Sequence, residues 1–252
     1  MTYAQLSRWW PPALAVLVVA FLTYSLPPYF VGSTRVPATF PLYYPLLVGH
    51  VLLGGVAMAA VVVQLWPRLR ARRPTLHRHA GRIYVATTIP AALSALVIGA
   101  ATPFGPALAV SNVLLAALWL WFTAAGFCAG RQGRVADHRR HMLRSATLAL
   151  SIITNRIWGP VLFRVGDPLY HNLFDGNGQH YLWFVAGLGG WLGWTVPLAL
   201  VQWWLYRRAF TTSSSIRQLT ETRPGRLRTR IGQRRRGRYD NGIQRQNRTG
   251  HP

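Results

Sequence analysis

Histidine and arginine gather in two short segments, residues 77–82 and 138–144, which we name the first box and the second box. Imidazole suits iron, copper and zinc, and guanidinium groups pair with haem propionates, phosphates and lipid headgroups. If the helices that begin at the boxes are neighbours, His77 and His138 could meet across a haem or a metal ion. His138 and His141 would share a helix face if that helix starts early enough. The alternative is that both boxes are solvated loops whose charge fixes the membrane topology.

Two further candidates lie inside apolar segments. His50 could be a haem or metal ligand, a proton relay or an interhelical hydrogen-bond donor, and the lack of a second histidine at its depth favours the hydrogen bond. Arg156 follows Arg144 by twelve residues, about 18 Å of helix, which predicts a place just past the centre of a slab about 30 Å thick. A cation there needs carbonyl groups near Pro160, a water-filled cavity, or an anionic or carbonyl-bearing ligand.

The two boxes flank a run from residue 83 to residue 130 that contains no charged residue. This run is too long for one membrane crossing, which needs about 20 apolar residues. It divides naturally at residues 102–106, where the sequence reads Thr-Pro-Phe-Gly-Pro. We therefore expect a hairpin of two spanning helices, and this hairpin would bring both boxes to the same side of the membrane.

The apolar segments predict an all-α polytopic bundle with about six crossings. We expect these crossings near residues 12–26, 46–66, 83–101, 107–129, 145–165 and 181–206, inside a transmembrane domain of residues 1–210. Arginines are plentiful in the segments after the second and fourth crossings and beyond the sixth, and scarce in the others. Because positive charge stays on the cytoplasmic side, both boxes and both termini are expected in the cytoplasm of a bacterial cell, at its cytoplasmic membrane.

The end of the chain differs sharply in composition from the rest. The net charge of +23 arises from 28 basic residues, all of them arginine, against five acidic ones. Eleven arginines lie in residues 211–252, which have few large apolar residues and are predicted to be a disordered tail. Such a tail is expected to contact anionic lipid headgroups or a membrane-protein partner rather than nucleic acid. Cys128 is the one cysteine, so no intrachain disulfide can form.

Several of these motifs together resemble a known family. They are His50-x-x-x-Gly54-x-x-Ala57, His77-Arg78 followed by Gly81-Arg82-x-Tyr84, residues 137–145 around His138, and Arg156. This combination, over residues 44–206, resembles the bacterial predicted membrane proteins called domain of unknown function 2306. The resemblance implies a polytopic membrane protein and no established activity. The family pattern has an aromatic residue at the position of His141, which favours His77 and His138 as the pair.

Three functions remain open from the sequence. The first is membrane electron transfer with haem b or a quinone, in which His50, His77 and His138 are ligands or proton relays and Arg156 holds a propionate or a carbonyl. The second is a small transporter or a lipid- or anion-binding protein that uses Arg156, and the third is a membrane assembly factor. All five acidic residues lie outside the expected crossings. Hydrolytic chemistry is therefore not expected, and no catalytic constellation is recognisable.

Overall fold

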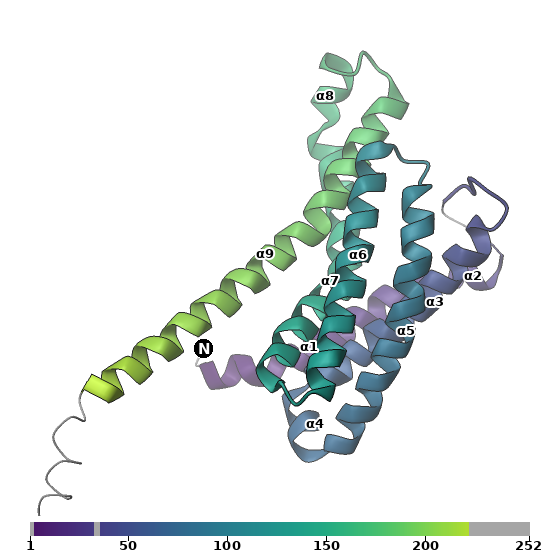
Figure 1. The fold of residues 1–252 in the computed structure, drawn as a ribbon. Coiled ribbons are helices and arrows are strands. Elements are labelled where there is room, and N and C mark those ends of the chain that lie inside the picture. The colour runs from purple at the N-terminus through teal and green to yellow at the C-terminus, as the bar shows by residue number, and fades with distance from the viewer. Residues whose placement is uncertain (1–2, 33–35, 222–252) are drawn as a thin grey trace, which may run out of the picture. The chain divides into compact units, whose positions relative to one another are not determined.

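The structure, a computed structural model, describes residues 3–32 and 36–221, and within them the chain forms helices joined by turns and short loops. Figure 1 shows the helices in chain order. Their bounds are α1 Tyr3–Ser25, α2 Pro27–Phe30, α3 Tyr43–Leu65, α4 Pro67–Arg72, α5 Pro74–Ala100, α6 Pro106–Arg131, α7 Val135–Val165, α8 Asp167–Asn172 and α9 Gly178–Glu221. The prediction of an all-α fold is thus confirmed.

Five of these helices are long and apolar enough to cross a membrane. They are α3, α5, α6, α7 and the part of α9 from Gly178 to Arg208. The first expected crossing falls in α1, whose apolar stretch Trp9–Ser25 is shorter than the other five. Five candidate crossings therefore stand where we expected about six, and the sixth, through α1, stays a prediction.

The uncharged run forms the predicted hairpin. Helices α5 and α6 pack side by side and are joined by a turn at residues 101–105 (Figure 1). Gly105 in this turn has φ +90°, and a Cβ atom there would lie 2.8 Å from the ring of Trp183, so a glycine suits both the backbone conformation and the close contact. We name this end of the bundle the hairpin end, and the opposite end, where both boxes lie, the histidine end.

The boxes themselves are helical, which corrects our expectation of loops up to residues 82 and 144. Helix α5 begins at Pro74 and α7 at Val135, so each box occupies the first turns of its helix. Pro74 at the start of α5 presets the helical φ, and Asp137 in the first turn of α7 suits the positive helix N-terminus. Arginine is compatible with these positions in the first turns of the helices, because its side chain reaches from a helix end into the headgroup region.

Small residues bring the helices close together. Helix α3 packs against α5, and α6 packs against α7. Ala57 of α3 and Ala91 of α5 are fully buried in the main apolar cluster. On α9, a Cβ on Gly187 or Gly190 would meet Ala107 or Leu108 of α6, and one on Gly193 would lie 2.8 Å from Cβ of Asn155 in α7. This is the close approach that small residues permit between membrane helices.

The chain divides into two compact units after Gln202. In the second unit the guanidinium groups of Arg207 and Arg208 stack on the rings of Trp203 and Trp204, at 4.2 and 4.0 Å from the ring centres. Helix α9 is described as far as Glu221. Residues 222–252, most of the arginine-rich tail, lie outside the described residues, so its disorder stays a prediction.

Candidate functional site

One histidine of each box lies at the histidine end, and burial, Arg70 and His138 together lower the pKa of His77. His77 on α5 and His138 on α7 are both half-buried, and they are close enough for their charges to interact, together with that of Arg70. The Nδ1 atom of His77 is buried and makes no hydrogen bond. Among the described helices, α5 and α7 do not pack closely against each other. The side chains of His77 and His138 therefore lie in the space between α5 and α7.

His138 is held in place by a glycine surface on α6. Its Nδ1 atom lies 2.8 Å from the backbone oxygen of Gly126, and because a carbonyl only accepts, Nδ1 carries the proton and Nε2 keeps its lone pair in the neutral ring. A Cβ on Gly130 would lie 2.9 Å from Nδ1 of His138. Histidines that bind metals are commonly oriented by this type of hydrogen bond.

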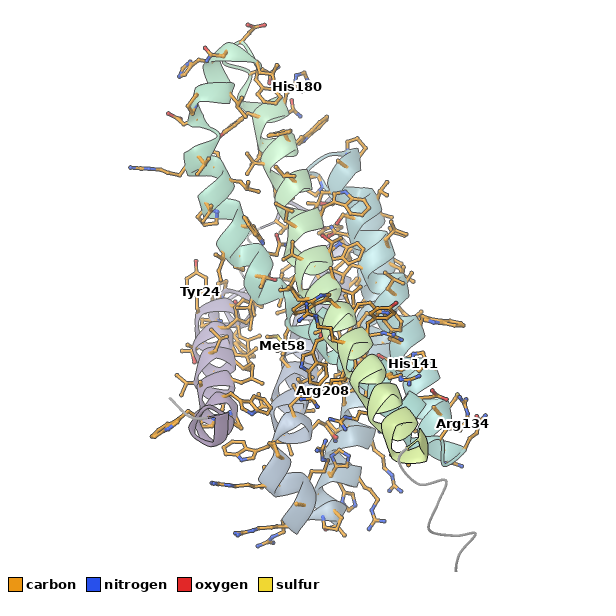
Figure 2. All side chains as sticks on the ribbon, turned by 90° about the vertical axis from the view of Figure 1, so that its left-hand side faces the viewer. Tyr24, Met58, Arg134, His141, His180 and Arg208 are labelled. Atoms are coloured by element: carbon orange, nitrogen blue, oxygen red, sulfur yellow. The ribbon has the colours of Figure 1, made fainter. Side chains whose placement is uncertain are left out.

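His141 and Arg144 lie beside the pair on the same helix, α7. The Nδ1 atom of His141 is buried without a hydrogen bond, and its ring centre is 6.0 Å from that of Phe122. Arg144 lies over the ring of Phe122, 5.5 Å from its centre, and donates from Nε to Oε1 of Gln202 at 2.9 Å. Figure 2 labels His141 and Arg134 near one end of the bundle and His180 at the other. A fixed cation thus stands next to the imidazoles.

A ring of four buried side chains connects α5, α6 and α7 deeper in the bundle. Trp119 donates from Nε1 to the Tyr84 hydroxyl at 3.1 Å. The Tyr84 hydroxyl lies 2.5 Å from Oγ of Ser145. Ser145 Oγ in turn lies 2.6 Å from Oγ1 of Thr123, and Thr123 donates to the backbone oxygen of Trp119 at 2.7 Å.

The direction of every hydrogen bond in this ring follows from its chemistry. A carbonyl accepts only, so the single hydroxyl proton of Thr123 goes to the Trp119 backbone. Thr123 must then accept from Ser145, and Ser145 must accept from Tyr84. The chain of donors starts at the indole of Trp119 and ends at the backbone oxygen of the same residue. The four side chains therefore form a closed ring with all their protons in use.

Sequence analysis did not assign these four residues to a site, although the sequence carries a signal. Tyr84 follows His77 by seven residues, and Ser145 follows His138 by seven. Seven residues are two helical turns, so each hydroxyl lies on the same helix face as its histidine and about 10 Å deeper. The spacing of seven places a hydroxyl and a histidine on one helix face only because both boxes are helical.

His50 lies apart from the two boxes. Its Nδ1 is 2.9 Å from the backbone oxygen of Ala91 on α5, and it must be the donor because a carbonyl only accepts. Ala91 lies fourteen residues beyond His77 on the same helix, about 21 Å of helical rise. The interhelical hydrogen bond is the role that the sequence favoured for His50. The free Nε2 lone pair leaves the proposal of a ligand or proton relay untested.

Arg156 lies apart from all three histidines. Its side chain is exposed on the surface of α7, and Asn155 beside it is packed against Gly193 of α9. The next residue of α9, Trp194, donates to Ser111 of α6, which lies five residues from the start of that helix. Five residues rise about 7.5 Å. Arg156 is therefore at about the level of Ser111, near the hairpin end of α6, and its depth in the membrane stays a prediction.

The histidine end offers two imidazoles rather than a cage for a bare metal ion. Within the described residues, no three histidine, cysteine or acidic side chains are grouped so that they could hold a metal ion. Arg70 lies near His77 and would repel a free cation, but it would attract the acidic groups of a larger ligand. The arrangement therefore suits a ligand that is planar, acidic or carbonyl-bearing.

Comparison with known families shows to which family the chain belongs. The model of the family described as "Predicted membrane protein (DUF2306)" matches residues 47–205, well over half of the chain. The chain belongs to this family. It is therefore a multi-pass membrane protein, and the family resemblance seen in the sequence is confirmed. No curated protein and no solved structure matches the chain significantly.

Removal of the Tyr84 hydroxyl tests the ring. Tyr84→Phe leaves the buried indole N–H of Trp119 without an acceptor, so the free energy of unfolding should fall by about 1–3 kcal/mol. Unfolding in detergent measures the loss, with Tyr44→Phe on the half-exposed part of α3 as the control. Because both residues belong to one ring, Thr123→Val should add less in the Tyr84→Phe background than alone. Equal losses from Tyr84→Phe and Tyr44→Phe would contradict the ring.

Replacement of Gly130 by alanine tests whether Gly130 keeps the His138 ring in its place. In Gly130→Ala the new Cβ would lie 2.9 Å from Nδ1 of His138, so the imidazole must move and give up its bond to Gly126. Acylation of His138 by diethyl pyrocarbonate, mapped by mass spectrometry, should then become faster. Gly54→Ala is the matched control, since nothing lies within 4 Å of a Cβ there. An unchanged rate at His138 would show that Gly130 does not hold the ring.

Proposed function

We propose that this multi-pass membrane protein binds haem b at the histidine end and serves electron transfer in the membrane. The observation that carries the proposal is that His77 and His138, on two helices that do not pack closely against each other, lie at the same end of the bundle and are near enough for their charges to interact. His138 offers Nε2 because its Nδ1 is bound to Gly126. His77, half-buried and with Nδ1 unpaired, is the second imidazole.

The surrounding charges support an acidic ligand. Arg70 interacts with His77, and Arg144 lies over Phe122 beside His141. Guanidinium groups at this position pair with the propionates of a haem. The closed ring at Tyr84 and Ser145 fills the space two turns deeper, so the ligand is placed between the ring and the membrane surface. Haem would supply a one-electron redox centre there.

A quinone is the second candidate for the same residues. Imidazole N–H groups donate to carbonyl oxygens, so a quinone held between the two histidines would accept hydrogen bonds from them. A quinone headgroup needs less room than a macrocycle and no open coordination position. The two candidates differ in their absorption, so one preparation separates them.

The colour of the purified protein tests this function. With haem supplied during expression, a reduced-minus-oxidised spectrum should show b-type bands, and His77→Ala and His138→Ala should each abolish them. His79→Ala is the control, because this exposed histidine bonds the backbone of Thr75 on its own helix. A colourless protein that carries extractable quinone, lost in the same two variants, would select the quinone. A protein with neither ligand would refute the redox site.

We also propose the orientation. Six crossings, with α1 as the first, would place both termini and both boxes in the cytoplasm, with the protein in a bacterial cytoplasmic membrane. The supporting observations are the common location of the boxes at the histidine end and the arginines there. The tail would contact anionic headgroups on the same side.

Cysteine labelling tests the orientation in a Cys128→Ser background. Arg72→Cys and Arg134→Cys should react with an impermeant maleimide only after the cells are opened. Gln179→Cys, at the hairpin end of α9, should react in intact spheroplasts. Labelling of Arg72→Cys and Arg134→Cys from opposite sides would overturn the shared site, whereas labelling of both from outside would reverse only the orientation.

A further inference from the structure

Thr88 on α5 is a buried residue whose hydroxyl group has no hydrogen-bond partner among the described residues. Its side chain is fully buried, at 0% exposure, and its Oγ1 atom makes no hydrogen bond. In a native protein such a group is costly, and it is usually bonded to the protein or to an ordered water molecule. The other buried polar side chains of the described part each form a hydrogen bond, namely Ser111, Thr123, Ser145 and Ser151.

The usual acceptor for a threonine hydroxyl group in a helix is already occupied. Threonine in a helix commonly donates to the backbone oxygen four residues earlier, as Thr147 and Thr195 do here. For Thr88 that acceptor is the backbone oxygen of Tyr84. This oxygen accepts from Oγ1 of Thr87 at 3.2 Å, in addition to its bond within the helix. Because a carbonyl oxygen has two lone pairs, it has no place for a third donor.

Thr88 lies next to the closed ring, one helical turn beyond Tyr84 on the same face of α5. It is near enough to the Tyr84 hydroxyl to interact with it, but the two groups make no direct hydrogen bond. The ring has no proton to offer, because all its protons are in use. The oxygen atoms of Tyr84 and Ser145 each accept one hydrogen bond within the ring and keep a second lone pair. The ring can therefore accept a further bond but cannot donate one.

We propose that a buried water molecule binds between Thr88 and the ring. It accepts the proton of the Thr88 hydroxyl and donates to the free lone pair of Tyr84 or Ser145. Water performs both roles and is small enough for a site whose side chains are fully buried. Buried water molecules typically make about three hydrogen bonds to groups that otherwise lack a partner. This site is separate from the histidines and does not depend on the proposed redox function.

X-ray radiolysis of the full chain in nanodiscs tests the proposal. Irradiation forms hydroxyl radicals from water, and these oxidise the side chains beside them, so a buried side chain is oxidised where a bound water molecule lies next to it. Tyr84, which is 1% exposed, should therefore be oxidised, as mapped by mass spectrometry. Tyr43 is the control, since it is similarly buried at 3% exposure and lies away from the ring. No oxidation of Tyr84, or equal oxidation of both tyrosines, would overturn the proposal.

Two variants of Thr88 identify the group that holds the water molecule. Thr88→Val removes the hydroxyl group and keeps the shape of the side chain, so it should reduce the oxidation of Tyr84 to the level of Tyr43 and lower the melting temperature. Thr88→Ser keeps the hydroxyl group and should keep the oxidation.

Thr195→Val is the control for stability, because the Thr195 hydroxyl donates to the backbone of its own helix. Its melting temperature should fall less than that of Thr88→Val. Unchanged oxidation of Tyr84 in Thr88→Val, its loss in Thr88→Ser, or a melting temperature of Thr88→Val at or above that of the unchanged protein would overturn the proposal. The oxidation of Tyr84 in the unchanged protein decides the matter even if Thr88→Val does not fold.

Discussion

A polar side chain buried between membrane helices must find its partner on another helix, because lipid offers none. The structure depends on this constraint where Tyr84, Ser145, Thr123 and Trp119 meet. Helices α5 and α7 do not pack closely against each other, yet the long tyrosine side chain joins them through Ser145. Helix α6 completes the ring with Trp119, which is both first donor and last acceptor, and with Thr123 one turn further along. Three of these four bonds join different helices and so help to fix the relative register of α5, α6 and α7.

The sequence was sufficient for the fold at the level of helices and hairpins. The uncharged run between the boxes and its Thr-Pro-Phe-Gly-Pro segment predicted two helices and a turn, which are α5 and α6. The helix starts were placed too late, because we took arginine to mark a loop. Hydropathy detects where the hydrocarbon ends, but a helix such as α7 continues into the headgroup region, where its arginines are solvated and the hydrogen bonding of its backbone still holds. Pro74 and Asp137 were the local signals for these starts.

The candidate site was predictable only in part. The boxes indicated His77 and His138, and the hairpin placed them at one end, because an even number of crossings returns the chain to the same side. The hydrogen-bonded ring could not be predicted from the sequence. The distance between Tyr84 and Ser145 depends on the register of two helices that are far apart in sequence. Arg156 was assigned a depth by counting from Arg144 alone. Its level relative to α9 and α6 follows from packing, through Asn155, Gly193 and Ser111, which a count along one helix does not give.

The closed ring also has a consequence for proton movement. Proton transfer along hydrogen-bonded hydroxyls requires an open chain, in which one end takes up a proton as the other releases one. Here the last acceptor is a backbone carbonyl on the residue that carries the first donor, so the ring has neither an entrance nor an exit. The four groups of the ring therefore do not by themselves conduct protons along the bundle. A proton exchanged by a ligand at His77 and His138 would therefore not be passed on through these four side chains.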